Sequence, residues 1–597
     1  MNKLGISRRS KGRVYILLAI LAVSLFVSLG SMALAEEAAK PEVAYRDIPL
    51  LGSRGIIWVV AQIHLLLAGF VLGVPIFGLV CEIIGIKTGD KRYDNLAKEF
   101  TKLLTASFAT TAMFGGVLLF SLIAFYPKFF SYMTNVFWPT YVVYALLFVF
   151  ETISLYLYWY GWDVMMNKKW LHITLGVCLN LAGFLIMIVS NAWVTFMASP
   201  ILMPEATPLL TKTWAAVHNP TWWPVNIHRI IGNIVFGGYV CGAYAAVKYL
   251  SAKTQEEKAH YDWMGYTGNF IGTFGLLTLP FAGYYLMREV YAFNQQMAIT
   301  LMGGILSWLF IIQAIQIGMM FIGVNYYFWQ GIAYRVDQPH TYKKYVIGML
   351  VVLVGCFLVW LTPHSLVASI EEARKMGGTF HPVLGVFGVM SAKLTAVNIM
   401  ILTTFASFLL YWRAGKTITA GWAKVATWAQ VALFFVAAAS IIYIGVYGYY
   451  VPAIFRVNVL SVLQVLLVLL ILTLVTPLTA LMLKSAKETT VMKWGVLPAS
   501  SQYALISNGV VVIFTMTLMG YVRSSSRTYW HIYGIMRDNS AYAYQPKLWE
   551  AAVMMAICTF FFCLIVAFIF WLSGLSKKAG HDEKAVPATG KPATAQH

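Results

Sequence analysis

Three ionisable side chains lie inside apolar stretches of the chain. His64 lies in QIHLLLAGFVLG, Glu151 lies in LLFVFETISLYLYWYGWD, and His228 lies near the start of the run Val225–Val247. Such groups cost several kcal/mol in hydrocarbon, so each needs a partner, a wet pocket or a cofactor. An imidazole can hold haem iron, and a buried carboxyl group can carry a proton. These residues predict redox or proton-transfer chemistry inside a membrane.

Each of these residues also has a purely structural explanation. A histidine near a span end can form a hydrogen bond at the interface, and a protonated glutamate can bind a neighbouring helix. Small residues in the run that contains His228 let either another helix or a flat macrocycle approach the backbone. These small residues are Gly232, Gly237, Gly238 and Gly242.

The elements that position these groups are membrane-spanning helices. The chain has 597 residues, of which 60% are hydrophobic and 11% charged, and apolar runs of span length recur throughout. We therefore expect an all-α, polytopic fold with about thirteen transmembrane helices. Their expected ranges are 56–84, 103–126, 139–162, 171–198, 226–248, 265–287, 300–327, 345–362, 384–412, 425–450, 457–483, 503–521 and 551–574.

The net charge of +20 comes from Lys and Arg in short loops. If every expected span is real, these loops all fall on one side, and the positive-inside rule makes that side the cytoplasm. We expect a bacterial inner-membrane protein whose His64 and His228 lie toward the periplasm. This distribution indicates contact with the lipid bilayer and argues against nucleic acid as a partner. The six cysteines form no C-x-x-C or C-x-x-C-H motif, which argues against covalent haem c and an iron–sulfur cluster.

Both ends of the chain differ from the spans. Residues 1–35 have a basic start, an apolar run from Val14 and small residues before Glu36, which predicts a signal peptide or an uncleaved anchor. Residues 575–597 are rich in Ala, Lys, Pro and Thr, and they predict a disordered cytoplasmic tail.

Two later segments carry arginine at the outer ends of spans. Arg456 and Asn458 lie in FRVNVL. The segment RSSSRTYWHIYG contains Arg523, Arg527, Trp530 and His531. Arginines at that depth suit haem propionates or lipid phosphate, and the sequence leaves both ligands open.

The order, side and spacing of these motifs resemble subunit I of the cytochrome bd quinol oxidases. The resemblance covers most of residues 56–287 and then about 453–574. We therefore expect two family-like domains, residues 36–288 and 453–574. The carrying motifs are the His64 span, KTGDKRYDNLAKEFTKLL, FETISLYLYWYGWD, SNAWVTFMASP, NIHRIIGNIVFGGYVCG, FRVN and SRTYWHIYG.

The resemblance implies a three-haem subunit that oxidises membrane quinol near the periplasmic face and reduces oxygen at a high-spin haem pair. It implies haem b, with haem d as a further option, and a second helical membrane subunit. By residue, it makes His228 an axial ligand of the low-spin haem b and His64 a ligand in the high-spin pair. Glu151 would be the carboxylate on the proton path, and Arg456 would contact the low-spin haem. Arg527 and Trp530 match the family's Gly-Arg-Gln-Pro-Trp segment.

The sequence departs from the family pattern at several positions. Asn458 stands where the family has the methionine of the low-spin haem, and Val143 stands at a second carboxylate position. Ser524 replaces the glutamate that ligates the other high-spin haem. The long quinol-binding loop is missing, and residues 289–452 replace it with four expected helices.

The inserted segment has a polar outer loop, TPHSLVASIEEARKMGGTFHPV, which lies between its expected spans. The loop could replace the quinol-binding loop or ligate an extra haem, or it could be a solvated loop. The residues that carry this expectation are His364, His381, Glu371 and Glu372.

Three functions follow, of which the first two carry nearly equal weight. The first is a quinol oxidase of cytochrome bd type that passes electrons to oxygen. The second is a non-oxidase, quinol-linked subunit that exchanges electrons with a periplasmic c-type cytochrome. The third, least favoured, is a haem-free transporter on the same scaffold.

Overall fold

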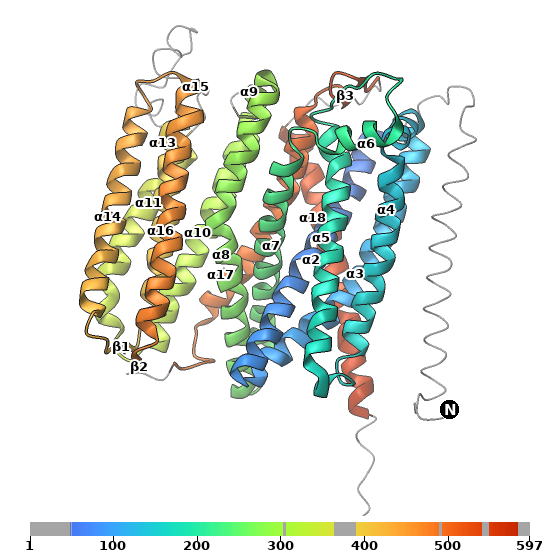
Figure 1. The fold of residues 1–597 in the computed structure, drawn as a ribbon. Helices are drawn as coiled ribbons and strands as arrows, with labels where there is room; N and C mark the ends of the chain where they lie inside the picture. The colour runs from blue at the N-terminus through green and yellow to red at the C-terminus, as the bar shows by residue number, and fades with distance from the viewer. Residues whose placement is uncertain are drawn as a thin grey trace, which may run out of the picture.

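The computed structural model describes Ile48 and residues 51–302, 306–362, 390–488, 492–539 and 548–582. Thirteen helices in these ranges are long and apolar enough to cross a membrane, which confirms the expected all-α, polytopic fold. They stand side by side in one bundle (Figure 1). The expected signal segment, residues 1–35, lies outside the described residues. In chain order the helices are α2 (Gly52–Thr88), α3 (Lys91–Phe125), α4 (Pro127–Tyr160), α5 (Lys169–Phe196), α7 (Trp222–Ser251), α8 (Gln255–Phe293), α10 (Ser307–Arg335), α11 (Lys343–Leu361), α13 (Met390–Arg413), α14 (Ala423–Tyr447), α16 (Ser461–Leu483), α17 (Ala499–Ser526) and α18 (Leu548–Asp582).

Short elements lie at the two ends of this bundle. Two antiparallel strand pairs connect later helices, β1 with β2 and β3 with β4. A π-helical turn precedes α16. The short elements are α6 (Leu209–Val217), α9 (Gln295–Met302), α15 (Ala453–Phe455), the π-turn Arg456–Leu460, the 3-10 turns Met166–Lys168 and Pro339–Tyr342, β1 (Lys416–Ile418), β2 (Ala486–Glu488), β3 (Trp530–Ile532) and β4 (Met536–Arg537).

Local sequence sets the boundaries of several helices. Gly89 ends α2 with a φ of 71°, a left-handed conformation that glycine adopts without strain. Asp90 then caps α3 by accepting the backbone N–H of Arg92, and hydrogen bonds from Arg92 lower the pKa of Asp90. Helix α8 begins with a capping box formed by Thr254 and Glu257. The turns between α2 and α3 and between α7 and α8 are therefore short and well defined.

Helices α7 and α8 approach each other closely through glycine. A Cβ atom on Gly238 would lie 2.5 Å from the backbone N of Gly272, and one on Gly268 would lie 2.8 Å from the backbone N of Gly242. A larger side chain at these positions would push the helices apart. Of the two partners left open for these glycines, the structure shows a helix at Gly238 and Gly242.

Four of the thirteen helices, α10, α11, α13 and α14, lie within residues 289–452 and form the left-hand part of the bundle with α16 (Figure 1). A buried ion pair ties this part to α8, since Arg335 Nη2 lies 2.6 Å from Asp262 Oδ1. Arg335 also donates to the Tyr411 hydroxyl of α13 at 2.5 Å, and the Gly495 N–H donates to Asp262 at 2.8 Å. The number of helices agrees with the expected insertion, whereas the domain division itself stays a prediction.

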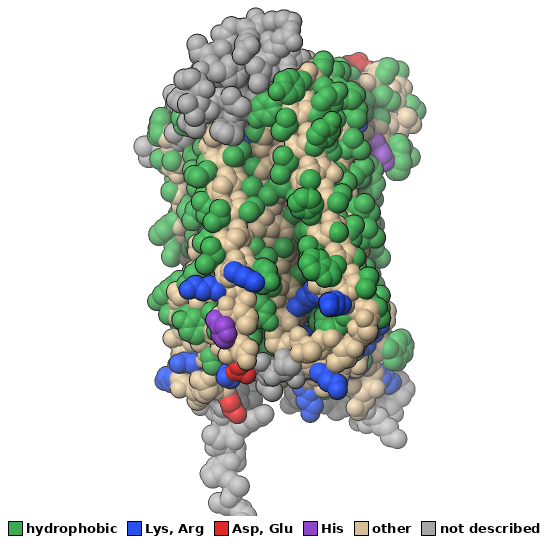
Figure 2. Space-filling view, turned by 90° about the vertical axis from the view of Figure 1, so that its left-hand side faces the viewer, with side chains coloured by type: hydrophobic (Ala, Val, Ile, Leu, Met, Phe, Trp, Pro, Cys, Tyr) green, Lys and Arg blue, Asp and Glu red, His purple; other side chains and the backbone are tan. Residues whose placement is uncertain are grey.

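Lys and Arg gather toward one end of the bundle. On the face drawn in Figure 2, the blue side chains lie near the lower end. We call this the basic end, and it includes the turns at Gly89 and Lys168 and the β1–β2 pair. The other end, which we call the cavity end, includes Tyr126, α6 and the β3–β4 hairpin (Figure 1).

Candidate functional site

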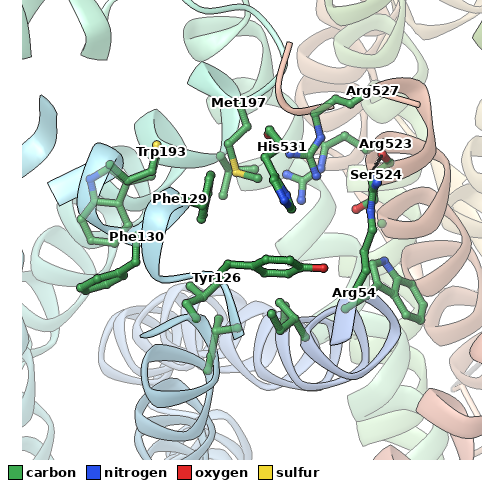
Figure 3. A pocket seen from close by; sticks show the side chains of 18 of the residues that line it. Arg54, Tyr126, Phe129, Phe130, Trp193, Met197, Arg523, Ser524, Arg527 and His531 are labelled. Carbon is green, nitrogen blue, oxygen red and sulfur yellow. Dashed lines mark hydrogen bonds between the residues drawn. The ribbon is translucent and has the colours of Figure 1, made fainter. Parts of the chain in front are cut away.

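A cavity of about 250 Å³ lies at the cavity end, between α2, α3, α4, α5, α17 and the β3–β4 hairpin. Most of its wall is apolar or aromatic. Figure 3 shows Trp193 and Phe130 on one side of the cavity and Arg54, Arg523 and Arg527 on the other. The cavity therefore suits a ligand with an apolar body and an anionic edge.

The three arginines of the cavity differ in how they are held. Arg54 Nη1 lies 3.1 Å from Asp538 Oδ2, and Arg527 Nη1 donates to the His531 carbonyl oxygen at 2.5 Å. The guanidinium of Arg523 has no hydrogen-bond or ion-pair partner in the part of the chain that the structure describes. A guanidinium without a partner at a membrane depth needs an anion, so Arg523 is the residue here best placed to bind one.

The β3–β4 hairpin positions His531 at the cavity. The Tyr533 N–H donates to the Met197 carbonyl oxygen at the end of α5 at 2.9 Å, and the Asp538 N–H donates to the Tyr529 carbonyl oxygen at 2.7 Å. The hairpin is thereby fixed against α5, and the His531 ring contacts the Tyr126 ring with centroids 4.4 Å apart.

His64 lies between α2 and α3, next to the deep wall of the cavity. Its Nδ1 lies 3.0 Å from the Thr111 carbonyl oxygen, and a Cβ atom on Gly115 would lie 3.1 Å from its Cε1. The neighbouring residues Ala61 and Leu65 line the cavity, whereas His64 itself does not. If Nδ1 carries the proton and donates to Thr111, the lone pair is on Nε2, as in a histidine that ligates a metal.

Glu151 is buried between α4 and α5, with 4% of its surface exposed. A Cβ atom on Gly183 of α5 would lie 3.0 Å from its Oε1 and 2.8 Å from Leu72 Cδ2 of α2. The glycine therefore leaves room for the carboxyl group where three helices meet. An interior carboxyl group in this position can hold a proton.

A second polar cluster lies at the basic end of the same helices. Glu82 of α2 has a fully buried side chain and accepts a hydrogen bond from the Tyr158 hydroxyl at 2.7 Å. His172 Nδ1 lies 2.7 Å from Glu82 Oε1, and its Nε2 lies 2.8 Å from the Tyr158 carbonyl oxygen. Lys169 Nζ lies 3.4 Å from Glu82 and 2.7 Å from Asp94. The charged groups of this cluster are thus bound to one another.

Comparison with known proteins decides the family. A family model described as cytochrome bd terminal oxidase subunit I matches residues 53–580. The chain belongs to this family. The resemblance found in the sequence is thereby confirmed, and the protein is a multi-span membrane subunit of the respiratory quinol oxidase type.

Individual relatives of this bd oxidase subunit are distant. A stretch of 203 residues is 22% identical to a Bacillus subtilis (strain 168) protein named "Putative cytochrome bd menaquinol oxidase subunit I", and it covers 32% of this chain and 44% of that protein. The chain thus matches less than half the length of this curated relative. The structure of bd oxidase from Geobacillus thermodenitrificans is similar with a TM-score of 0.48 and 12% identity, over 88% of this chain and 98% of that chain.

The residues expected at the low-spin haem lie around α8 in this bd subunit. The His228 ring lies against Gly283, where a Cβ atom would be 3.8 Å from its Nε2. The adjacent Tyr284 hydroxyl donates to the Val457 carbonyl oxygen in the π-turn before α16. The π-turn that contains Arg456 is therefore in contact with α8 at Tyr284, next to the glycine that packs against His228. That His228 and this turn share a haem stays a prediction.

Arg456 and Asn458 point to different surroundings. Arg456 is 2% exposed, and its Nη1 donates to the Gly448 carbonyl oxygen at 3.2 Å. Asn458 is exposed, and its Nδ2 donates to the Ile454 carbonyl oxygen of its own turn at 3.0 Å. Asn458 is thus arranged as a local helix residue, and its role as an iron neighbour remains an untested expectation.

The remaining expected site residues divide into two groups. Arg527 lines the cavity, whereas Trp530 does not and packs under the Arg537 guanidinium, 5.1 Å from the ring centroid. The four loop residues of the inserted segment lie outside the described residues. These are His364, His381, Glu371 and Glu372.

Several residues of the cavity and of the basic-end cluster were not predicted from the sequence. Arg54, at the very start of α2, was not among the expected residues. Arg523 was expected, because it lies with Arg527 in RSSSRTYWHIYG at the outer end of a span. Glu82 and His172 gave no signal in the sequence, because they come from separate helices and meet only in the folded chain.

Proposed function

We propose that this bd oxidase subunit binds haem at the cavity end, takes electrons from membrane quinol and passes them to oxygen. One observation carries the proposal: the cavity is mostly apolar, and its wall has Arg54, Arg527 and Arg523, whose guanidinium has no partner among the described residues. Haem is a flat apolar molecule with an anionic propionate edge, so this wall chemistry fits it.

The residues of the chain have separate tasks in this proposal. Arg523 and Arg527 bind the carboxylate edge of the ligand, and the aromatic wall of Trp193 and Phe130 excludes water. His64 offers Nε2 from the deep side while Thr111 fixes its ring. Bound haem supplies reversible one-electron redox chemistry and, with an open iron position, oxygen binding.

Glu151 holds a proton beside this site. Its carboxyl group is enclosed by α2, α4 and α5, the helices that also form the cavity walls. A proton carrier here would deliver protons to the reduced acceptor without opening the site to bulk water. His228 is the proposed ligand of the low-spin haem b that accepts electrons from quinol.

The proposal places the protein in the bacterial inner membrane, with the basic end in the cytoplasm and the cavity end toward the periplasm. The proposed partners are membrane quinol and a second helical membrane subunit. This orientation puts electron entry on the periplasmic side and proton supply on the other side.

The test is made on the full chain, purified in mild detergent with any subunits that accompany it. We expect a Soret band, two or more haems per chain by pyridine haemochrome assay, and oxygen uptake with a reduced quinol. A colourless preparation contradicts haem binding. Haem without oxygen uptake contradicts the oxidase reaction.

A second function is favoured by two positions that carry carboxylates near the oxygen-reducing haems in the family. Ser524 supplies no carboxylate to the cavity wall, and Val143 is 46% exposed on α4. These residues support a subunit that passes electrons to a periplasmic c-type cytochrome instead. That function predicts a reduced spectrum unchanged by carbon monoxide, whereas an oxidase binds carbon monoxide at a high-spin haem.

A further inference from the structure

His531 contributes the imidazole at the cavity wall. It is the histidine among the lining residues that the structure describes, and Figure 3 shows its ring directed into the cavity beside Met197. Its side chain is 14% exposed. The Tyr126 and Phe129 rings lie 4.4 Å and 5.6 Å from it, centroid to centroid, so the ring stands in an aromatic setting with one side open to the cavity.

The backbone that carries His531 is held at several points. Its carbonyl oxygen accepts a hydrogen bond from Arg527, and the next residue, Ile532, is fully buried in an apolar cluster. Trp530 pairs with Arg537 across the hairpin. A ligand residue on such a fixed element needs little reorganisation when it binds.

A buried carboxylate lies behind the ring. His531 Nε2 is 3.7 Å from Asp538 Oδ1, and the Asp538 side chain is fully buried. The other oxygen of Asp538 binds Arg54 at 3.1 Å, which fixes the direction of the carboxylate. His531 Nε2 and Asp538 Oδ1 are at an ion-pair distance and slightly beyond a hydrogen bond. A carboxylate beside the second ring nitrogen is a common feature of metal-bound histidines. Nδ1 of His531 has no hydrogen-bond partner in the described parts of the chain.

The charge state of the ring suits ligation. Burial lowers the pKa of His531 to about 4, and Arg54 and Arg527 add to this effect against the opposing pull of Asp538. The ring is therefore neutral at neutral pH and has a lone pair available for a metal.

We propose that His531 is an axial iron ligand of a haem bound in the cavity, with Asp538 as the residue that orients its ring. The inference rests on the proposed function, since it requires haem in this cavity. It assigns the ligand role to the hairpin, whereas Ser524 on the neighbouring wall has only a hydroxyl group, a weak iron ligand. Arg523 then binds the anionic edge of the same haem, and the Met197 thioether borders it.

The test uses the full chain with its accompanying subunits, purified with bound haem. His531→Ala should remove the optical and electron paramagnetic signals of one haem, while the remaining haems keep theirs. Added imidazole should restore the lost signal in His531→Ala. Asp538→Asn should keep the haem but shift its reduction potential. His218→Ala is the matched control, because His218 is an exposed histidine at the same end and does not line the cavity.

A second variant keeps the inference testable if His531→Ala fails to assemble. Ser524→Glu combined with His531→Ala places a carboxylate ligand on the adjacent wall, and it should recover the haem count with an altered spectrum. Unchanged spectra in His531→Ala would overturn the inference while leaving the proposed function intact. Absence of haem from the wild-type protein would instead overturn the proposed function.

Discussion

At the basic end of the α2–α5 bundle, Glu82, His172 and Lys169 bind one another, whereas at the cavity end Arg523 faces a space. Glu82 and His172 are buried by these helices, whereas Arg523 is half-buried at the cavity wall. The hydrogen bonds of the basic-end cluster, 2.7 to 2.8 Å between Glu82, His172 and Tyr158, satisfy its polar atoms. The cavity end instead keeps one cation without a protein partner.

The charged residues of the basic-end cluster therefore stabilise the fold, whereas Arg523 at the cavity end is placed to bind a ligand. Burying an ion costs several kcal/mol, and a partner or a ligand must offset that cost. In the basic-end cluster the partner is protein, so its removal should affect folding. At the cavity no described residue pairs with the Arg523 guanidinium, so removal of this arginine should affect ligand binding instead.

The largest expected effect is on folding at the basic end. Glu82→Ala leaves the buried His172 without its carboxylate, while Lys169 keeps Asp94, and this should lower the free energy of unfolding by about 3 kcal/mol. Thermal unfolding in detergent measures this change. Asp337→Asn is the control, since it removes a carboxylate from the exposed Lys493 pair at the same end. Equal melting temperatures of Glu82→Ala and the control would contradict the structural role of the cluster.

The next effect concerns the haem site beside the cavity. His228→Ala should abolish the low-spin haem b signal, because the ring against Gly283 is the proposed ligand. The signals of haem in the cavity should persist. An optical and electron paramagnetic spectrum measures both, and an unaltered low-spin signal would refute the role of His228.

The cavity end is tested with Arg523→Leu. Loss of this guanidinium should weaken haem retention by roughly 1.5–3 kcal/mol, the usual value of a hydrogen bond to a charged group. The haem-free protein should be no less stable, because an unpaired cation has been removed. Haem titration and thermal unfolding of the haem-free form check both points. If Arg523→Leu lowered the melting temperature of the haem-free protein as much as Glu82→Ala does, Arg523 would have a structural role and the two ends would not differ.

A smaller effect should appear on acidification at the cavity end. The folded pKa of His531, about 4, lies below the ordinary value of 6.5, so the unfolded chain binds the proton first as pH falls. Stability should be constant above pH 6.5 and decline between pH 6.5 and about 4, by at most about 3 kcal/mol. Melting temperatures of the haem-free protein across this range measure it. The decline should be smaller in His531→Leu, and an equal decline in both proteins argues against His531 as its source.

The smallest effect is expected at Asn458. Its side chain is exposed and bonded to its own helical turn. Asn458→Ala should therefore leave the low-spin haem spectrum unchanged, and the free energy of unfolding should stay within about 0.5 kcal/mol of wild type. Loss of the low-spin signal in this variant would show that Asn458 reaches the iron site.

The sequence was sufficient for the number and type of spans, because each span is a long apolar run that can be read locally. It also identified Glu151, since a carboxylate in such a run is conspicuous, and the structure places it in the interior. The cavity was harder to foresee. Arg54 and Arg523 meet from opposite ends of the sequence, and His531 enters through a short hairpin with little hydrophobic pattern. Only tertiary packing brings these residues together.

The ion pair between Arg335 and Asp262 has a consequence for any shortened form of the chain. It joins residues 289–452, the expected insertion, to α8 in a place that neither lipid nor water reaches. Excising residues 289–452 would remove Arg335 and leave the buried Asp262 carboxylate without its cation. A shortened chain would need a compensating change at Asp262 before it could fold.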